Sequence, residues 1–255
     1  MLQPRLQRSE SDKPLLVGLC GSQGSGKSTV CKELAAKWSD QGLRVAVLSL
    51  DDLYLTRAER ENLARDVHPL LATRGVPGTH DVSLGIRTLQ ALSKQGSVKL
   101  PRFDKATDDR SQEASWDVVQ APVDVILFEG WCVGARPQSR ETLSHPINSL
   151  EAAEDADVRW RNYVNDRLAG EYQKLFALID FLVLLAAPGF DVVLRWRTQQ
   201  ERELRVQRRG SAVMEDAALA RFVQHYERLT RHILSEMPRR ANLVINLDED
   251  RRVVS

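Results

Sequence analysis

The chain has 255 residues, of which 42% are hydrophobic and 28% are charged, and its formal net charge is +1. This length can bury the core of one α/β domain but is short for two independent domains. The balanced charge gives no general attraction to nucleic acid, and no apolar run reaches the roughly 20 residues of a membrane span. We therefore expect a cytoplasmic protein without a nucleic-acid or membrane partner, while its oligomeric state stays open.

The chain begins with a polar stretch, residues 1–13, which we expect to be a flexible leader to a domain of residues 14–255. Residues 15–20 are continuously apolar, as is typical of a strand buried on both faces of a sheet. After a short loop, apolar side chains recur at helical spacing up to about residue 41. A strand, a loop and a helix are thus predicted in that order.

The loop between this strand and helix fits the pattern G-x-x-x-x-G-K-[ST], the phosphate-binding P-loop. Its glycines let successive backbone N–H groups point at phosphate oxygens, and the positive end of the helix adds to the attraction. Lys27 is expected to reach the β- and γ-phosphates, Ser28 to bind Mg²⁺ through its hydroxyl, and Thr29 to begin the helix. The residues predicted to bind the nucleotide are Gly21, Ser22, Gln23, Gly24, Ser25, Gly26, Lys27, Ser28 and Thr29.

Carboxylates follow two further predicted strands. Residues 45–50 lead into Asp51 and Asp52, and residues 123–128 lead into Glu129. The carboxyl ends of parallel strands are where open α/β sheets bind their ligands. We therefore expect Asp51 and Glu129 to lie near the P-loop, and the predicted metal ligands are Ser28, Asp51 and Glu129.

A long segment separates these two strands, and residues of about 54–115 are expected to form an acceptor-site insertion. Thr56 and Glu59 have the spacing of a capping box, which predicts a helix over residues 57–66. A second helix is predicted over residues 82–94 and a short strand over residues 98–100. The loops at residues 74–80 and 101–110 are rich in turn formers and in charge, respectively.

The last part of the chain continues the alternation of helices and strands. Residues 136–149 are expected to be irregular, and residues 156–179 to form one long helix or two with a break at Gly170. Strands are predicted at residues 181–186 and 242–246, and a helical stretch rich in arginine, residues 191–209, is expected to belong to a lid over about residues 190–211. Five buried strands alternating with helices predict a doubly wound, parallel P-loop NTPase sheet.

The P-loop alone does not decide the activity, because switch GTPases, motor ATPases, transporters and kinases share it. A lone Glu129 stands where a motor usually has two adjacent acids, and the chain has no N-K-x-D signature for guanine. Phosphoryl transfer to a small hydroxyl acceptor needs a base, Mg²⁺ and movable cations, and Asp51 and the arginine-rich helix can supply the first and last. This pattern favours a small-molecule kinase that uses ATP and Mg²⁺. A regulatory protein that hydrolyses ATP slowly is the second hypothesis.

Two motifs resemble a group of P-loop kinases. Residues 49–54 (SLDDLY) together with residues 127–130 (LFEG) resemble the uridine kinase, phosphoribulokinase and pantothenate kinase group. The resemblance implies that Asp51 is the general base and that Glu129 helps to hold Mg²⁺. Residues 101–104 (PRFD) are similar to the group's P-x-[YF]-D element, which implies that Phe103, Asp104 and the downstream Arg110 contact the substrate.

A narrower resemblance covers most of the chain. Residues 74–81, 103–105, 129–131, 148–151 and 196–205 resemble the D-glycerate 3-kinase family. This implies ATP-dependent phosphorylation of D-glycerate on its 3-hydroxyl, with Arg197 and Arg205 as catalytic lid residues. The sequence departs from the family's pattern after Lys105, where the loop is shorter, and at Leu53, where phenylalanine is common.

The charges of the two insertion loops favour a small anionic hydroxy acid as acceptor, because a carboxylate is best held by cationic, preferably forked, donors. A nucleoside, pantothenate or a sugar phosphate is the alternative acceptor. The residues predicted to contact the substrate are Asp52, Tyr54, Arg74, His80, Arg102, Phe103, Asp104, Lys105 and Arg110.

Overall fold

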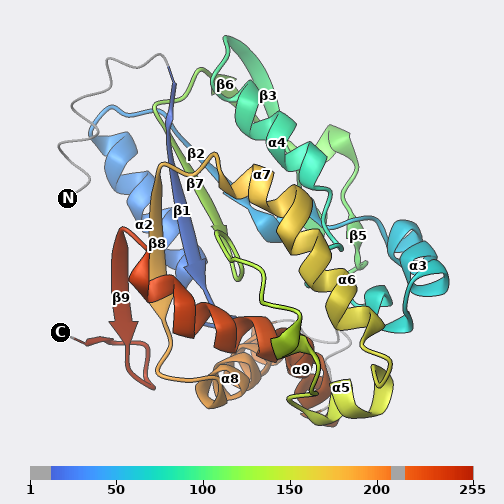
Figure 1. Cartoon of the computed structure of the whole chain (residues 1–255). Coiled ribbons are helices and arrows are strands. Elements are labelled where there is room, and N and C mark those ends of the chain that lie inside the picture. Colours follow the sequence, from blue (N-terminus) through green and yellow to red (C-terminus); the bar gives the residue numbers. More distant parts are fainter. Residues whose placement is uncertain (1–12, 208–215, 255) are drawn as a thin grey trace.

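The computed structural model describes residues 13–207 and 216–254, with side chains for residues 13–199 and 218–254. The predicted leader, apart from Lys13, and the end of the predicted lid therefore lie outside the described residues. A sheet with the strand order β10-β9-β8-β1-β7-β2 runs through the middle of the molecule (Figure 1). Its strands are β1 (Leu15–Gly21), β2 (Val45–Ser49), β7 (Val125–Gly130), β8 (Phe181–Ala186), β9 (Leu243–Leu247) and β10 (Val253–Val254).

Helices cover both faces of this sheet, and two short hairpins stand apart from it. The helices are α2 (Lys27–Asp40), α3 (Arg57–Asp66), α4 (Val82–Ala91), α5 (Ser149–Glu154), α6 (Arg159–Arg167), α7 (Gln173–Phe176), α8 (Asp191–Gln207) and α9 (Asp216–Glu236). The hairpins pair β3 (Gly96–Leu100) with β6 (Asp117–Ala121), and β4 (Phe103–Asp104) with β5 (Asp109–Arg110).

The five predicted strands are confirmed, and all of them run parallel. The sheet also has an antiparallel edge strand, β10, which the sequence did not predict because two residues cannot show a period. In the observed register, Ser49 at the end of β2 lies opposite Glu129 of β7, and Leu19 of β1 lies on the other side of Glu129. The register therefore brings the P-loop, Asp51 and Glu129 together at the carboxyl ends of the strands.

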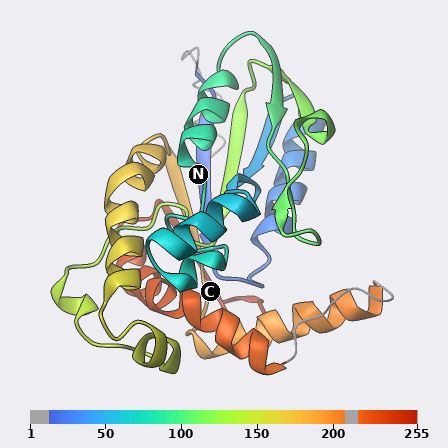
Figure 2. The same cartoon turned by 90° about the vertical axis from the view of Figure 1, so that its right-hand side faces the viewer.

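Two large clusters of buried residues pack against the sheet, one on each face. One cluster packs the sheet against α4, α7 and α9, through residues such as Leu89, Leu175 and Ile233. The other packs it against α2 and the start of α8, through residues such as Trp38 and Trp196. Figures 1 and 2 show α8 and α9 lying across the carboxyl ends of the strands.

The insertion between β2 and β7 has the predicted capping box. The Thr56 N–H donates to Glu59 Oε2 at 2.8 Å and the Glu59 N–H donates to Thr56 Oγ1 at 3.3 Å, so α3 begins at Arg57 as expected. The helix predicted over residues 82–94 ends at Ala91, and the strand predicted over residues 98–100 is longer and pairs with β6, which was not predicted.

The helical segment before β8 is shorter than the prediction and has one interruption. It begins at Arg159, and a π-helical turn, Leu168–Tyr172, contains Gly170 and joins α6 to α7. Its break thus falls at the predicted glycine. The stretch predicted as irregular before it is mostly so, although α5, which begins at Ser149, was not predicted.

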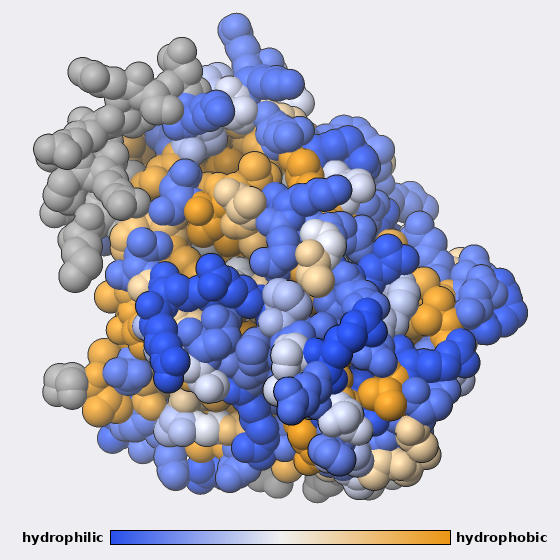
Figure 3. Space-filling model, in the orientation of Figure 1, coloured by the Kyte–Doolittle hydropathy of each residue, from blue (hydrophilic) through white to orange (hydrophobic). Residues whose placement is uncertain are grey.

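Hydrophilic residues cover most of the face seen in Figure 3, and hydrophobic residues gather mainly in a patch at its upper left. Among the described residues, no helix combines the length and apolar character that a membrane crossing requires. The cytoplasmic location stays a prediction of the sequence, and the oligomeric state stays open.

Candidate active site

The P-loop joins the end of β1 to the start of α2, and two of its glycines, Gly24 and Gly26, have φ angles of 77° and 87°, in the left-handed region. Helix α2 begins at Lys27, two residues earlier than predicted. Ser22 Oγ and Ser25 Oγ are buried and have no hydrogen-bond partner among the described residues. Because a buried polar atom without a partner is costly, this loop is suited to bind an oxygen-rich ligand such as a polyphosphate.

Ser28 and Glu129 form a pair of oxygen ligands beside the P-loop. Ser28 Oγ donates a hydrogen bond to Glu129 Oε1 at 2.8 Å, and Glu129 Oε2 is buried with no partner in the part of the chain that the structure describes. The side chain of Glu129 reaches this place because Glu129 lies near the carboxyl end of β7, the strand between β1 and β2. Hydroxyl and carboxylate oxygens are the ligands that Mg²⁺ prefers, so these two residues fit the predicted metal.

Asp51 lies in a short helical turn that follows β2, where Ser49 Oγ accepts a hydrogen bond from its N–H at 3.2 Å. Tyr54 Oη donates to Asp51 Oδ1 and Lys105 Nζ donates to Asp51 Oδ2, both at 2.7 Å. Burial raises the pKa of Asp51, but the positive charges of Lys105 and Lys27 outweigh it and hold that pKa well below its ordinary value. The carboxylate is therefore ionised at neutral pH, as a general base must be.

A cleft of about 160 Å³ unites the P-loop, this carboxylate and the insertion. It also includes residues from α8 and α9, so that it is bounded by parts of the chain that are far apart in sequence. Its lining residues are Gln23, Gly24, Lys27, Ser28, Asp51, Tyr54, Arg74, Lys105, Trp131, Arg197, Phe222 and Tyr226. The guanidinium of Arg197 lies 6.0 Å from the ring centroid of Phe222. The other predicted lid residue, Arg205, lies in α8, but its side chain is outside the described residues.

Arg74 is held in this cleft by contacts to its backbone and to its side chain. Tyr226 Oη donates to the carbonyl of Arg74 at 2.9 Å, and Trp131 Nε1 donates to the carbonyl of Gly75 at 2.8 Å. The guanidinium of Arg74 pairs with Asp108 and lies 5.5 Å from the ring centroid of Phe103. A forked cation that is fixed in this way is suited to bind a planar anion.

Two predicted substrate residues, Arg102 and Asp52, hold the insertion to the strand end instead of lining the cleft. Arg102 pairs with Asp52 at 3.1 Å and with Asp117 at 2.7 Å, and Asp52 also accepts a hydrogen bond from the Phe103 N–H at 3.1 Å. These contacts fix the hairpin that presents Lys105. A direct contact of Arg102 or Asp52 with the substrate stays a prediction.

Arg110 and Asp104 also bind other parts of the protein. Arg110 donates to the carbonyl of Tyr54 at 2.9 Å and lies 3.6 Å from a carboxylate oxygen of Asp81. Asp104 accepts from the Ala106 N–H at 2.9 Å and thereby closes the turn that leads to Lys105. Both residues position the wall of the cleft, and their contact with a substrate stays a prediction.

His80 is not the cation that the sequence predicted. It is buried behind Tyr54, with the two ring centroids 4.7 Å apart, and its Nδ1 lies 2.6 Å from Tyr172 Oη. Burial lowers its pKa to about 3, so the imidazole is neutral at pH 7. His80 supports Tyr54 rather than offering a charge to an anion.

The chain shares most of its length with known kinases. It is 36% identical over 235 residues to "Uncharacterized kinase mug58" of Schizosaccharomyces pombe, which is 86% of this chain and 81% of that protein. It is 34% identical over 224 residues to the chloroplastic D-glycerate 3-kinase of Arabidopsis thaliana, which is 84% of this chain but only 46% of that longer protein. The solved structure of a D-glycerate 3-kinase from Cryptococcus neoformans is 27% identical, with a TM-score of 0.79 over 100% of this chain and 95% of that one.

This chain belongs to the family of P-loop kinases that includes the D-glycerate 3-kinases. It is therefore a kinase, as the sequence predicted. Residues 4–54 also match the family described as "Methylmalonyl Co-A mutase-associated GTPase MeaB". That segment contains the P-loop and ends just after β2, so it covers the part of the fold that P-loop proteins of different activities share.

The kinase has residues at its site that the sequence did not reveal. Arg251 Nε donates to the carbonyl of Gly24 at 2.6 Å, and its guanidinium lies 5.3 Å from the ring centroid of Trp196. The end of the chain thus fixes the P-loop to the start of α8. Phe222 and Tyr226 of α9 belong to the core, and both also line the cleft. Only the hydroxyl of Tyr226 could have indicated a polar neighbour.

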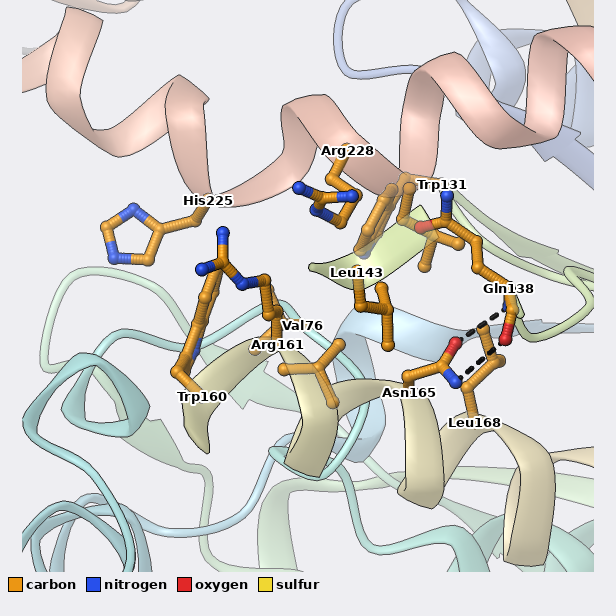
Figure 4. Close-up of a pocket in the computed structure, with 12 residues that line it drawn as sticks. Val76, Trp131, Gln138, Leu143, Trp160, Arg161, Asn165, Leu168, His225 and Arg228 are labelled. Atoms are coloured by element: carbon orange, nitrogen blue, oxygen red, sulfur yellow. Dashed lines mark hydrogen bonds between the residues drawn. The ribbon is translucent and has the colours of Figure 1, made fainter. Parts of the chain in front are cut away.

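Another pocket, of about 30 Å³, lies between α6 and α9 (Figure 4), and Trp131 lines both this pocket and the cleft. Beside it, the fully buried carboxylate of Glu151 pairs with Arg161 at 3.0 Å and with Arg228 at 2.6 Å. Burial lowers the pKa of the neighbouring His225 to about 4, so this residue is neutral. The ion pairs join α5, α6 and α9.

Proposed function

We propose that this kinase transfers the γ-phosphate of ATP to a hydroxyl group of a small carboxylic acid, with D-glycerate and its product 3-phosphoglycerate as the first candidates. The observation that carries the proposal is that two cations from separate loops, Arg74 and Lys105, line the same cleft as Asp51 and Lys27. Two cations can hold a carboxylate while the neighbouring carboxylate of Asp51 faces a hydroxyl group.

The residues present support the following division of roles. The P-loop N–H groups and Lys27 would bind the phosphates, and Ser28 and Glu129 would hold Mg²⁺. The bound ion would neutralise phosphate charge. As the acceptor oxygen forms its bond to the γ-phosphorus, its proton passes to Asp51, and the bond from the γ-phosphorus to the bridging oxygen breaks with its electrons left on ADP.

In this proposal the wall of the acceptor pocket is the insertion of about residues 54–115, and α8 belongs to the lid predicted over residues 190–211. Arg197, which lines the cleft from α8, would then cover the charge that develops on the transferred phosphoryl group. The two relatives named D-glycerate 3-kinase support the choice of acceptor.

The test is a steady-state assay of ATP consumption with D-glycerate, L-glycerate, pantothenate, uridine and ribulose 5-phosphate. We expect the highest kcat/KM with D-glycerate. A far higher kcat/KM with uridine or pantothenate would overturn the proposed acceptor.

A further inference from the structure

Both oxygens of the proposed base are already occupied. Asp51 Oδ1 accepts from Tyr54 and Asp51 Oδ2 accepts from Lys105. Each oxygen keeps a lone pair that could accept a further hydrogen bond, but an ammonium group on the carboxylate makes it a weaker proton acceptor. Asp51 therefore gains basicity if its charged partner moves away.

The two partners of Asp51 differ in their freedom to move. Tyr54 is buried between His80, at 4.7 Å between ring centroids, and Phe103, at 5.1 Å. Lys105 lies in the turn between β4 and β5, and its side chain is 59% exposed. Its long, flexible stem can carry the ammonium to a new position, and little desolvation opposes the movement because the group is already largely in water. Lys105 is thus the partner that can leave.

An anion bound in the cleft would compete with Asp51 for the ammonium group of Lys105. Arg74 and Lys105 both line the cleft, but Arg74 is fixed by Asp108, Phe103 and Tyr226, whereas the hydrogen bond of Lys105 goes to Asp51. A carboxylate bound to Arg74 competes with Asp51 for the second cation. A neutral alcohol or water offers no such competition.

We propose that Lys105 is a specificity-determining residue that makes the base available only when an anionic acceptor is bound. The carboxylate of the acceptor takes the ammonium from Asp51, whose Oδ2 then accepts the proton of the acceptor hydroxyl. This inference rests on the proposed phosphoryl transfer from ATP and adds that the negative charge of the acceptor is a condition for turnover. It also follows that Lys105 suppresses attack by water when no acceptor is present.

The test compares Lys105→Met, which keeps the length of the stem but removes the charge, with Lys99→Met as control. Lys99 is an exposed lysine of the same insertion that pairs with Glu113 at 3.2 Å, away from the cleft. Lys105→Arg keeps a cation and serves as the rescue variant. Three rates are measured for each protein: ATP hydrolysis without acceptor, phosphorylation of D-glycerate, and phosphorylation of glycerol, its neutral analogue.

We expect Lys105→Met to hydrolyse ATP without acceptor at least about threefold faster than the wild type, and to lose at least about tenfold of its preference for D-glycerate over glycerol. Lys99→Met should match the wild type, and Lys105→Arg should keep hydrolysis low. Unchanged or slower hydrolysis in Lys105→Met would overturn the inference, even if the KM for D-glycerate rose. If none of the acids is an acceptor, the proposed function fails, but the hydrolysis rate without acceptor still tests the role of Lys105.

Discussion

Gly75 shows how single residues fix the acceptor cation. Its φ angle is +127°, and a Cβ added there would lie 2.0 Å from Tyr226 Oη. That hydroxyl cannot easily move away, because it donates to the carbonyl of Arg74 at 2.9 Å. The close approach of backbone and tyrosine therefore sets the position of Arg74 and requires glycine at residue 75.

We predict that Gly75→Ala destabilises the kinase and raises the KM for its acceptor. The control is Gly42→Ala, where φ is +85° but no atom lies within 4 Å of the added Cβ. The control should lose about 1–2 kcal/mol from backbone strain alone, and Gly75→Ala should lose clearly more. Urea unfolding and acceptor kinetics measure both effects. Equal losses of stability together with an unchanged KM would show that Gly75 does not position Arg74.

The sequence predicted the residues whose place follows from the strands, and missed those whose place follows from distant contacts. Asp51 and Glu129 were predictable because each lies at or just after the carboxyl end of a strand. The roles of Arg102 and Arg110 were not predictable, because the number of cations in a loop does not show which carboxylates they pair with in the fold. Arg251 was missed because its partners, Gly24 and Trp196, are far away in the sequence.

Helix α8, which the proposal assigns to the lid, contacts the P-loop. Its Trp196 is buried, donates through Nε1 to the carbonyl of Glu249 at 2.7 Å, and packs against Gly24 of the P-loop. The first half of α8 is therefore anchored, and Arg197 stands next to the anchor. A cation in this place needs little rearrangement to act on the phosphates.

We predict that Arg197→Ala lowers kcat by about 10²–10³-fold while the Kd for ATP changes by less than about threefold, because a donor aimed at the developing charge acts mainly in the transition state. Arg195→Ala is the matched control, since Arg195 is on the same helix but pairs with Glu249 at 2.9 Å and is exposed. Equal losses in kcat and in ATP affinity would mean that Arg197 is a static ATP contact.

Among the elements, the long buried strands were predicted correctly because a continuous apolar run is a strong signal. The strands β6 and β10 were missed, since β6 is largely exposed and β10 has only two residues. Their pairing with β3 and β9 depends on neighbours in space, which the local pattern does not contain.

At the scale of the whole molecule, two buried histidines link stability to pH. Burial lowers the pKa of His80 to about 3 and that of His225 to about 4, whereas the ordinary value is 6.5. The unfolded chain therefore binds more protons below pH 6.5 than the folded protein does. The stability that these neutral side chains contribute is complete above pH 6.5 and is lost as the pH falls toward 4 and then 3.

We predict that the free energy of unfolding decreases as the pH falls from 6.5 to 4.5, with each histidine adding up to about 1.4 kcal/mol per pH unit. In His225→Gln the pH dependence of the free energy of unfolding should decrease by the contribution of one histidine, whatever the stability of the variant at pH 7. Urea unfolding at a series of pH values measures the slope. The same slope in the wild type and in His225→Gln would contradict the assignment of His225 as a buried neutral group.

The most direct test of the central claim, that Asp51 is the base in a cleft shared with the P-loop, is the kcat of Asp51→Asn measured beside its ATP affinity. Asparagine keeps the shape of the side chain and an oxygen that can accept from Tyr54, but it cannot take a proton. Lys27→Ala is the reference variant, which should lose turnover because the phosphates are no longer bound by Lys27. We predict that Asp51→Asn lowers kcat by about 10²–10⁴-fold and leaves the Kd for ATP within about threefold. A loss of kcat smaller than about tenfold would contradict the account, because a general base contributes more than that.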